Sequence, residues 1–203
     1  MIDTLKSPIL PRKFYIRPVL NVAKDLLGKV LLYKSGGDVF AARIVEVEAY
    51  DGKNDKASHS YSGKTKRNEV MFYEGGYFYV YFTYGTHFCC NVVTGKKSFG
   101  AAVLIRAVEP LLGINKMITN RFGRELKSEK EFYNLTSGPG KVCKAFGFDK
   151  SHSGFDLTNS DIFIVDQPKL SKKMIGVSKR IGITKSVSLP WRFFEIDNPH
   201  LSR

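Results

Sequence analysis

Residues 39–50 read VFAARIVEVEAY, and this alternation of apolar and other side chains predicts a β-strand. Successive side chains of a strand point to opposite faces of the sheet, so Glu46 and Glu48 should share one face. Earlier along the strand the same face carries Phe40, Ala42 and Ile44, and at its end Tyr50. Two carboxylates on an otherwise apolar face do not fit a simple core strand. This conflict makes the strand the first candidate for a functional site.

The aromatic residues gather in a second predicted strand, which reads YFYVYFTY at residues 77–84. Glycine-containing turns before and after it predict a hairpin with the following FCCNVV segment. Tyr84 stands directly before the second turn, where packing gives little reason for a large ring. Such a ring could instead enter a stack of nucleic-acid bases as a wedge.

The two faces of this aromatic strand differ in character. The expected core face carries Phe78, Val80 and Phe82. The opposite face carries Tyr77, Tyr79 and Tyr81. Tyrosine rings are amphipathic and suit stacking against bases, although packing is the simpler expectation for Tyr77 and Tyr79.

The rest of the chain reads as one domain that mixes helix and strand patterns. Helices are predicted at residues 19–30, 109–122 and 137–148, and further strands at 101–108, 162–166 and 191–196. Pro110 would lie in the first turn of the second helix. Residues 51–76 form a long polar loop, a kind of segment that is often functional. The glycine-rich SGPGK turn could hold a phosphate through the backbone amides of the helix that it opens.

The charge of the chain indicates a polyanionic partner. The 203 residues carry a formal net charge of +13, and so large an excess is typical of nucleic-acid-binding proteins. A membrane surface is disfavoured, because we find no basic amphipathic helix with a continuous apolar face. Between residues 167 and 194 seven side chains are Lys or Arg and none is acidic. That stretch is either a solvated basic face or a face that contacts phosphates.

The three cysteines form no CxxC pair, and their number is odd. A zinc site or a disulfide framework is therefore not expected, and no motif asks for another metal or a cofactor. The N-terminal residues do not read as a signal peptide, and no stretch approaches the length of a membrane span. We expect a cytoplasmic protein, associated with the nucleoid if it is bacterial.

Glu48 has two interpretations from the residues alone. Carboxylates at strand ends are often surface groups or members of ion pairs. Beside apolar groups, Glu48 could instead be a base that positions and deprotonates water, with the Tyr50 ring orienting a planar substrate. Glu46 could complete a pair of carboxylates, but we expect it to be structural and paired with an arginine. His59, in the polar loop, would by itself be an ordinary surface histidine.

Several motifs occur together in one order: ARIVEVEAYDG, ASHS, RNEVMF, YVYFTYGTHFCCNV, AAVLIRAVEP and SGPGK. This ordered set resembles the alkyladenine (3-methyladenine) DNA glycosylase family, in its single-domain mammalian type, which also occurs in bacteria. The resemblance covers nearly the whole chain. It implies a single mixed α/β domain over residues 1–203, built on a curved, open-barrel-like antiparallel sheet with surrounding helices. Residues 1–17 would be an extended N-terminal segment.

The resemblance also implies roles for individual residues. Glu48 matches the general base that activates water, and Arg106 matches the arginine that helps to hold the water and the carboxylate. The residues that match those enclosing a flipped base are Tyr50, His59 and Tyr81. Asn91 matches the residue at the pocket floor that disfavours the amine of normal guanine. The matches to DNA-contacting positions are the wedge Tyr84 and the backbone-contacting Thr65, Arg67 and Lys141.

The implied activity is that of a monofunctional, monomeric DNA glycosylase that uses no cofactor. It would flip alkylated or deaminated purines of the 3-methyladenine, 7-methylguanine and hypoxanthine class out of double-stranded DNA and hydrolyse the N-glycosidic bond. No lysine is placed by a motif for a lyase step. Thr86 and His87, beside the wedge, depart from the bulkier residues common in the family. The alternatives are a non-catalytic module that binds single-stranded nucleic acid by stacking and a basic RNA-associated structural protein, and neither explains all of these residues.

Overall fold

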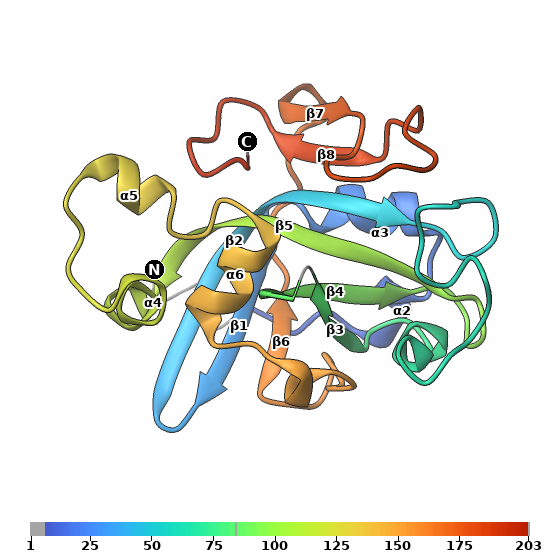
Figure 1. Cartoon of the computed structure of the whole chain (residues 1–203), viewed down its shortest axis with the longest axis horizontal. Coiled ribbons are helices and arrows are strands. Elements are labelled where there is room, and N and C mark those ends of the chain that lie inside the picture. Colours follow the sequence, from blue (N-terminus) through green and yellow to red (C-terminus); the bar gives the residue numbers. More distant parts are fainter. Residues whose placement is uncertain (1–6, 84, 203) are drawn as a thin grey trace.

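The computed structural model describes residues 7–83 and 85–202. Its centre is an antiparallel sheet of eight strands, ordered β3-β4-β5-β2-β1-β6, with β8 beside β2 and β7 beside β8 (Figure 1). The strands are β1 Val30–Ser35, β2 Asp38–Tyr50, β3 Phe78–Thr83, β4 His87–Thr94, β5 Ala101–Leu112, β6 Ile162–Val165, β7 Ile175–Ser178 and β8 Arg192–Glu195. The predicted mixed α/β fold around a curved antiparallel sheet is confirmed.

Short helices surround this sheet. They are α2 Arg12–Tyr15, α3 Val19–Leu26, α4 Ile114–Phe122, α5 Glu129–Tyr133 and α6 Pro139–Phe146, with 3-10 turns η1 Glu69–Phe72, η2 Lys150–His152 and η3 Lys172–Met174. Helix α3 packs on β2 and β5, while α6 packs on β4, β5 and α4. No helix in the part of the chain that the structure describes has the length and apolar character of a membrane span.

The long strand β2 connects two parts of the sheet. One of its edges pairs with β5 from Ala41 to Tyr50. Its other edge pairs with β1 over its first half and with β8 only at residues 46–48. The two carboxylates therefore lie where β1 has ended and β8 takes its place.

A bulge in β2 reverses which face its side chains occupy. The register with β5 shifts on both sides of Glu46, and an extra residue of this kind breaks the strict alternation of a strand. Before the bulge, Phe40, Ala42 and Ile44 belong to the main core. After it, the main core instead contains Val47 and Ala49. Our prediction that Glu46 and Glu48 share the apolar face was therefore wrong: they share a face with each other, opposite the core.

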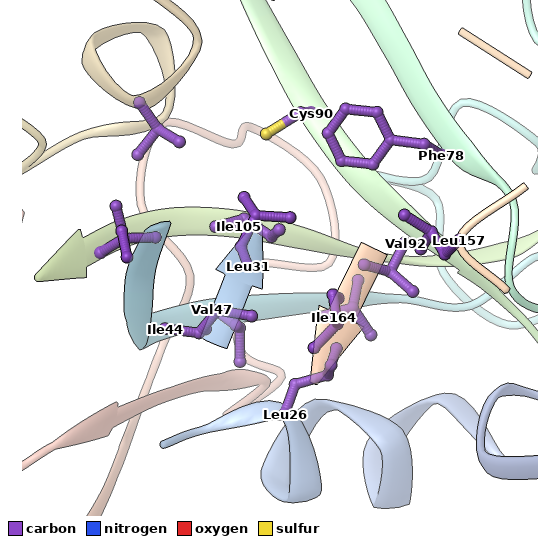
Figure 2. Packing of buried hydrophobic residues seen from close by; sticks show 14 of the residues in the cluster. Leu26, Leu31, Ile44, Val47, Phe78, Cys90, Val92, Ile105, Leu157 and Ile164 are labelled. Carbon is purple, nitrogen blue, oxygen red and sulfur yellow. The ribbon is translucent and has the colours of Figure 1, made fainter. Parts of the chain in front are cut away.

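The main core lies between the curved sheet and several helices, α3, α4 and α6 among them. Figure 2 shows Leu26 of α3 near Ile164 of β6, with Phe78 and Cys90 of the β3–β4 hairpin farther from the helix. Leu31 of β1 lies beside Ile105 of β5. Each of these side chains is at most 1% exposed. The core therefore holds β2 rigidly from its apolar face, and the opposite face is left for the site.

The second predicted helix begins later than expected. Residues 101–112 form one strand, in which Pro110 pairs with Ala42 beside a register shift, and α4 starts only after Gly113. Proline lacks an N–H group, and a strand tolerates it at such an irregularity. Gly113 has a φ of +76°, and a Cβ there would come within 2.7 Å of the Val39 carbonyl oxygen. The strand-to-helix turn thus requires glycine.

Three further predictions need correction. Phe82 was expected in the core but is 47% exposed, with its ring against Phe88 near the end of the hairpin. Residues 1–17 were expected to be extended, yet α2 lies within them. Helix α5 lies in a segment that carried no helical prediction, and Ser128 caps it by accepting a hydrogen bond from the Glu131 amide.

Candidate active site

Glu48 is fully buried at 0% exposure, where it accepts two hydrogen bonds and forms one ion pair. The Tyr50 hydroxyl donates to Oε2 at 2.7 Å. The backbone amide of Ile181 donates to Oε1 at 2.8 Å, and Arg106 Nη1 lies 3.2 Å from the same oxygen. A buried carboxylate is strongly disfavoured unless it is paired and hydrogen-bonded, and these groups meet that requirement. Burial and then the negative charge of Glu48 raise the pKa of Tyr50, so its hydroxyl remains a donor.

Glu46, at the bulge of β2, lies at the centre of a second cluster of charged and polar groups behind Glu48. Arg192 Nε lies 2.6 Å from Oε1 of Glu46, and Arg106 Nε lies 3.2 Å from the same atom. Ser202 donates to Glu46 through its backbone N–H at 2.6 Å and through its hydroxyl at 2.8 Å. Arg106 is thereby shared between both carboxylates. The prediction that Glu46 is structural and paired with an arginine agrees with this geometry.

A cavity of about 410 Å³ opens in front of this charged layer. Three partners of Glu48, namely Tyr50, Arg106 and the Ile181 residue, contribute to its lining. Glu48 itself lies one layer behind them. The cavity has the size typical of small-ligand sites, roughly 300–1,000 Å³.

Aromatic rings form one wall of the cavity. The rings of Tyr79 and Tyr81 are stacked with centroids 5.5 Å apart, and the His59 ring meets Tyr81 edge-on at 4.4 Å. His59 Nδ1 lies 3.3 Å from the Tyr79 hydroxyl. Partial desolvation and the nearby charge of Arg67 lower the pKa of His59, which favours the neutral ring. The wall thus contains Tyr79 as well, which we had expected only to pack.

Asn91 and Cys89, both on β4, complete the cavity beside the aromatic wall. Asn91 is 4% exposed, and its Nδ2 donates to the Tyr79 carbonyl at 3.1 Å, so the orientation of its amide is set by strand β3. Burial raises the pKa of the Cys89 thiol to about 12, so it is an uncharged group against Tyr81. The structure therefore brings together five predicted residues around Glu48: Tyr50, His59, Tyr81, Asn91 and Arg106.

Three further predicted residues, Thr65, Arg67 and Lys141, do not line the cavity. Thr65 and Arg67 are exposed on the long loop, where Arg67 donates to the Phe82 carbonyl at 3.1 Å. Lys141 lies on α6 and donates to Asn134 and to the Ser137 hydroxyl. Tyr84 lies outside the described residues.

Sequence reasoning missed several groups that shape the site. Asp55 and Arg180 form a buried ion pair, and Ile181 and Ser202 reach the carboxylates through backbone amides. A backbone donor leaves no residue-type signal in a sequence. We had assigned the basic stretch at 167–194 to solvent or phosphates, yet Arg180 is only 6% exposed and Arg192 pairs with Glu46. The stretch itself contains no acidic residue, so the sequence did not indicate that its arginines pair with Glu46 of β2 and with Asp55 of the loop after β2.

The site has the chemistry of acid, base and aromatic groups. Across residues 7–83 and 85–202, no cluster of three or more His, Cys, Asp or Glu side chains has a geometry that could hold a metal ion. The three cysteines are free and buried. The arrangement can accept a flat, apolar-faced ligand and present a carboxylate held by an arginine and a phenol at one end.

Known proteins resemble this chain over nearly its whole length. A family model described as methylpurine-DNA glycosylase matches residues 13–199. A relative from Alkaliphilus oremlandii is 47% identical over 200 residues, covering 96% of this chain and 98% of the relative. One from Carboxydothermus hydrogenoformans is 47% identical over 196 residues, covering 96% and 99%, and one from Clostridium novyi is 42% identical over 200 residues, covering 96% and 98%. Each of the three carries the name of a candidate 3-methyladenine DNA glycosylase.

Proposed function

The chain belongs to the methylpurine-DNA glycosylase family, and from this premise we propose that it is a monofunctional DNA glycosylase. It removes alkylated or deaminated purines of the 3-methyladenine, 7-methylguanine and hypoxanthine class from double-stranded DNA. The reaction hydrolyses the N-glycosidic bond and leaves an abasic site, with which base excision repair begins.

The single observation that carries this proposal is the setting of Glu48. A carboxylate held by Arg106, Tyr50 and the Ile181 amide, directly behind an aromatic cavity, suits a base whose position must be exact to act on water. In the described contacts, Oε2 accepts only from Tyr50, and a carboxylate oxygen can accept a second hydrogen bond there. Glu48 orients and deprotonates a water at this oxygen for attack on C1′ of the deoxyribose. Its negative charge also stabilises the oxocarbenium-like sugar in the transition state.

The cavity supplies the recognition of the base. An extruded purine lies between Tyr50 and the wall of Tyr81 and His59. A purine that alkylation has made cationic gains a cation–π interaction with electron-rich rings, worth about 1–2 kcal/mol in a desolvated site. Asn91, with its amide held by the Tyr79 carbonyl, disfavours the exocyclic amine of normal guanine.

Extrusion of the base has a cost of a few kcal/mol, which is lowest for damaged or mispaired bases. Tyr84 fills the space that the base leaves and keeps the base from returning. The DNA backbone is contacted by exposed cations of the long loop, which include Arg67, and by Thr65 and Lys141. A non-catalytic stacking module would need rings and cations but not a buried carboxylate held by an arginine, a phenol and a backbone amide, so the glycosylase is favoured.

The experiment that tests this proposal uses Glu48→Gln, which preserves size while removing the base. Duplexes that contain 7-methylguanine or hypoxanthine are incubated with excess enzyme, and abasic sites are cleaved by alkali. We expect the wild-type protein to produce breaks only at the lesion. The variant should bind the same duplexes with similar affinity and excise nothing measurable. Single-turnover excision by Glu48→Gln at the wild-type rate would overturn the assignment of the base.

A further inference from the structure

We propose that Arg180 is a positioning residue for the excision reaction: paired with Asp55, it holds the Ile181 amide against Glu48 and supports the ring of Tyr50. Neither Arg180 nor Asp55 lines the cavity, and both act through the groups that do. The inference rests on the proposed function, because it assigns the support of the same site.

The pair itself is bidentate and fully buried. Arg180 Nη1 lies 2.5 Å from one oxygen of Asp55, and Nη2 lies 2.8 Å from the other. Both side chains have 0% exposure. Parallel hydrogen bonds of this kind restrict the direction as well as the distance of the two groups. The guanidinium can therefore rotate little without breaking the pair.

The pair also joins two loops that form different parts of the cavity lining. Asp55 belongs to the loop after β2, which contributes Lys56, Ala57 and His59 to the cavity. Arg180 belongs to the segment after β7, which contributes residues 181–185 to the cavity lining. A second link, from the Lys56 amide to the Ser186 hydroxyl at 3.0 Å, lies between the same two loops. The relative position of these cavity walls thus depends on the Asp55–Arg180 pair.

Two contacts carry this support to the reaction centre. Arg180 directly precedes Ile181, whose N–H donates to Glu48. In addition, Nη1 of Arg180 donates to the carbonyl of Ala49 at 2.8 Å, and Ala49 lies between Glu48 and Tyr50 on β2. The Arg180 guanidinium also lies over the Tyr50 ring, 4.6 Å from its centroid. One face of Tyr50 is therefore covered, and only the other face is left to a base.

The chemistry of the pair argues against a role in stability alone. Apolar residues of similar volume often stabilise a fold as well as or better than a buried ion pair. Arginine is needed here for its geometry: one planar group donates to Asp55 and Ala49 while it stacks on Tyr50, which a lysine ammonium cannot do. A side chain that meets three such demands beside a candidate catalytic carboxylate is suited to holding it in position.

The test compares Arg180→Gln, Asp55→Asn and the double variant with a matched control. Lys29→Met removes another buried cation, which pairs with Asp166 at 2.6 Å outside the cavity. For each protein we would measure the thermal midpoint, the affinity for a duplex with a cleavage-resistant 2′-fluoro lesion nucleotide, and the single-turnover excision rate at saturating enzyme. Arg180→Lys serves as a milder variant that keeps a charge opposite Asp55.

We expect both single variants to lose about tenfold or more in the saturating excision rate, while lesion affinity stays within threefold. The double variant should lose no more than the worse single variant, because the two residues act as a unit. Lys29→Met should lower the thermal midpoint but leave the rate per folded molecule unchanged, and Arg180→Lys should give an intermediate rate. Wild-type saturating rates in folded Arg180→Gln or Arg180→Lys protein would overturn the inference. Absence of excision by the wild-type protein would instead overturn the proposed function.

Discussion

The Tyr50 hydroxyl donates a 2.7 Å hydrogen bond to Oε2 of Glu48, two residues earlier on the same strand face. A tyrosine in this position can both hold the carboxylate and present its ring to the cavity. The two roles can be separated by substitution. Tyr50→Phe keeps the ring and removes the donor, whereas Tyr50→Leu removes both.

For Tyr50→Phe we expect the single-turnover excision rate to fall roughly tenfold to a hundredfold, because a hydrogen bond to a charged group contributes about 1.5–3 kcal/mol. Affinity for lesion DNA should stay near the wild-type value. Tyr50→Leu should weaken lesion affinity as well. Excision time courses at saturating enzyme and binding titrations separate the two effects. Equal losses of affinity in both variants would show that the hydroxyl, and not the ring, binds the base.

Ser202 gives a second prediction, for the layer behind Glu48. Its hydroxyl donates to Glu46 and accepts from Arg106 Nη2 at 3.1 Å, so it helps to direct the guanidinium that Glu48 shares. Ser202→Ala should slow saturating excision about threefold to tenfold and lower the free energy of unfolding by about 1 kcal/mol. Ser202→Thr keeps the hydroxyl and should restore the rate. If the excision rates of the variants merely followed their free energies of unfolding, and Ser202→Thr did not restore the rate, the positioning role would be contradicted.

The sequence predicted local structure better than it predicted which groups meet. Strand β2, the aromatic hairpin and the helix opened by SGPGK were all evident from periodicity and turn residues. The bulge at Glu46 was not, because an extra residue in one strand is defined only by its partner strand. Alternation therefore assigned Glu46 and Glu48 to the wrong face. The carboxylates were still singled out correctly, because charge on an apolar pattern is conspicuous wherever it points.

Long-range partners were the part that the sequence could not supply. Asp55 and Arg180 are separated by 125 positions, and each alone looks like an ordinary charged loop residue. Pro110 shows the reverse case, in which a local rule for helix starts lost to pairing with Ala42. Family resemblance pointed to residues that line the cavity, for which we propose contacts with the substrate. It did not identify the residues that support them, since those act through backbone amides and buried ion pairs.

Two lysines in the cavity lining allow a test of the monofunctional assignment. Lys56 and Lys185 both line the cavity, and both are exposed. In the proposed reaction a water activated by Glu48, and neither lysine, attacks C1′, so no imine forms between the enzyme and the sugar. Incubation of the enzyme with lesion DNA and sodium borohydride should therefore trap no covalent complex. A trapped complex that disappears in Lys56→Ala or Lys185→Ala would show that the enzyme also has a lyase step.

The buried tyrosines and Cys89 predict how stability changes in alkali. Burial raises the pKa of Cys89 from 9.0 to about 12, and it raises the pKa of Tyr79 from 10.0 to about 12. A group whose pKa is raised by folding binds its proton more tightly in the native state. Its contribution is complete below the pKa of the unfolded chain and is lost as the pH rises toward the folded value.

Burial also raises the pKa of the Cys143 thiol. Stability should accordingly be level with respect to these groups below pH 9 and fall above it, at first through Cys89 and Cys143 and above pH 10 also through Tyr79. Each group adds a slope of at most about 1.4 kcal/mol per pH unit. Urea unfolding at half-unit steps from pH 8 to about 10.5 measures this slope. Cys89→Ala still contains the buried Cys143 thiol, whose pKa burial also raises, so its decline should begin at the same pH as that of the wild-type protein. Its slope between pH 9 and 10 should be smaller than the wild-type slope by up to about 1.4 kcal/mol per pH unit. An unchanged slope in Cys89→Ala would mean that the Cys89 thiol ionises as easily in the folded protein as in the unfolded chain.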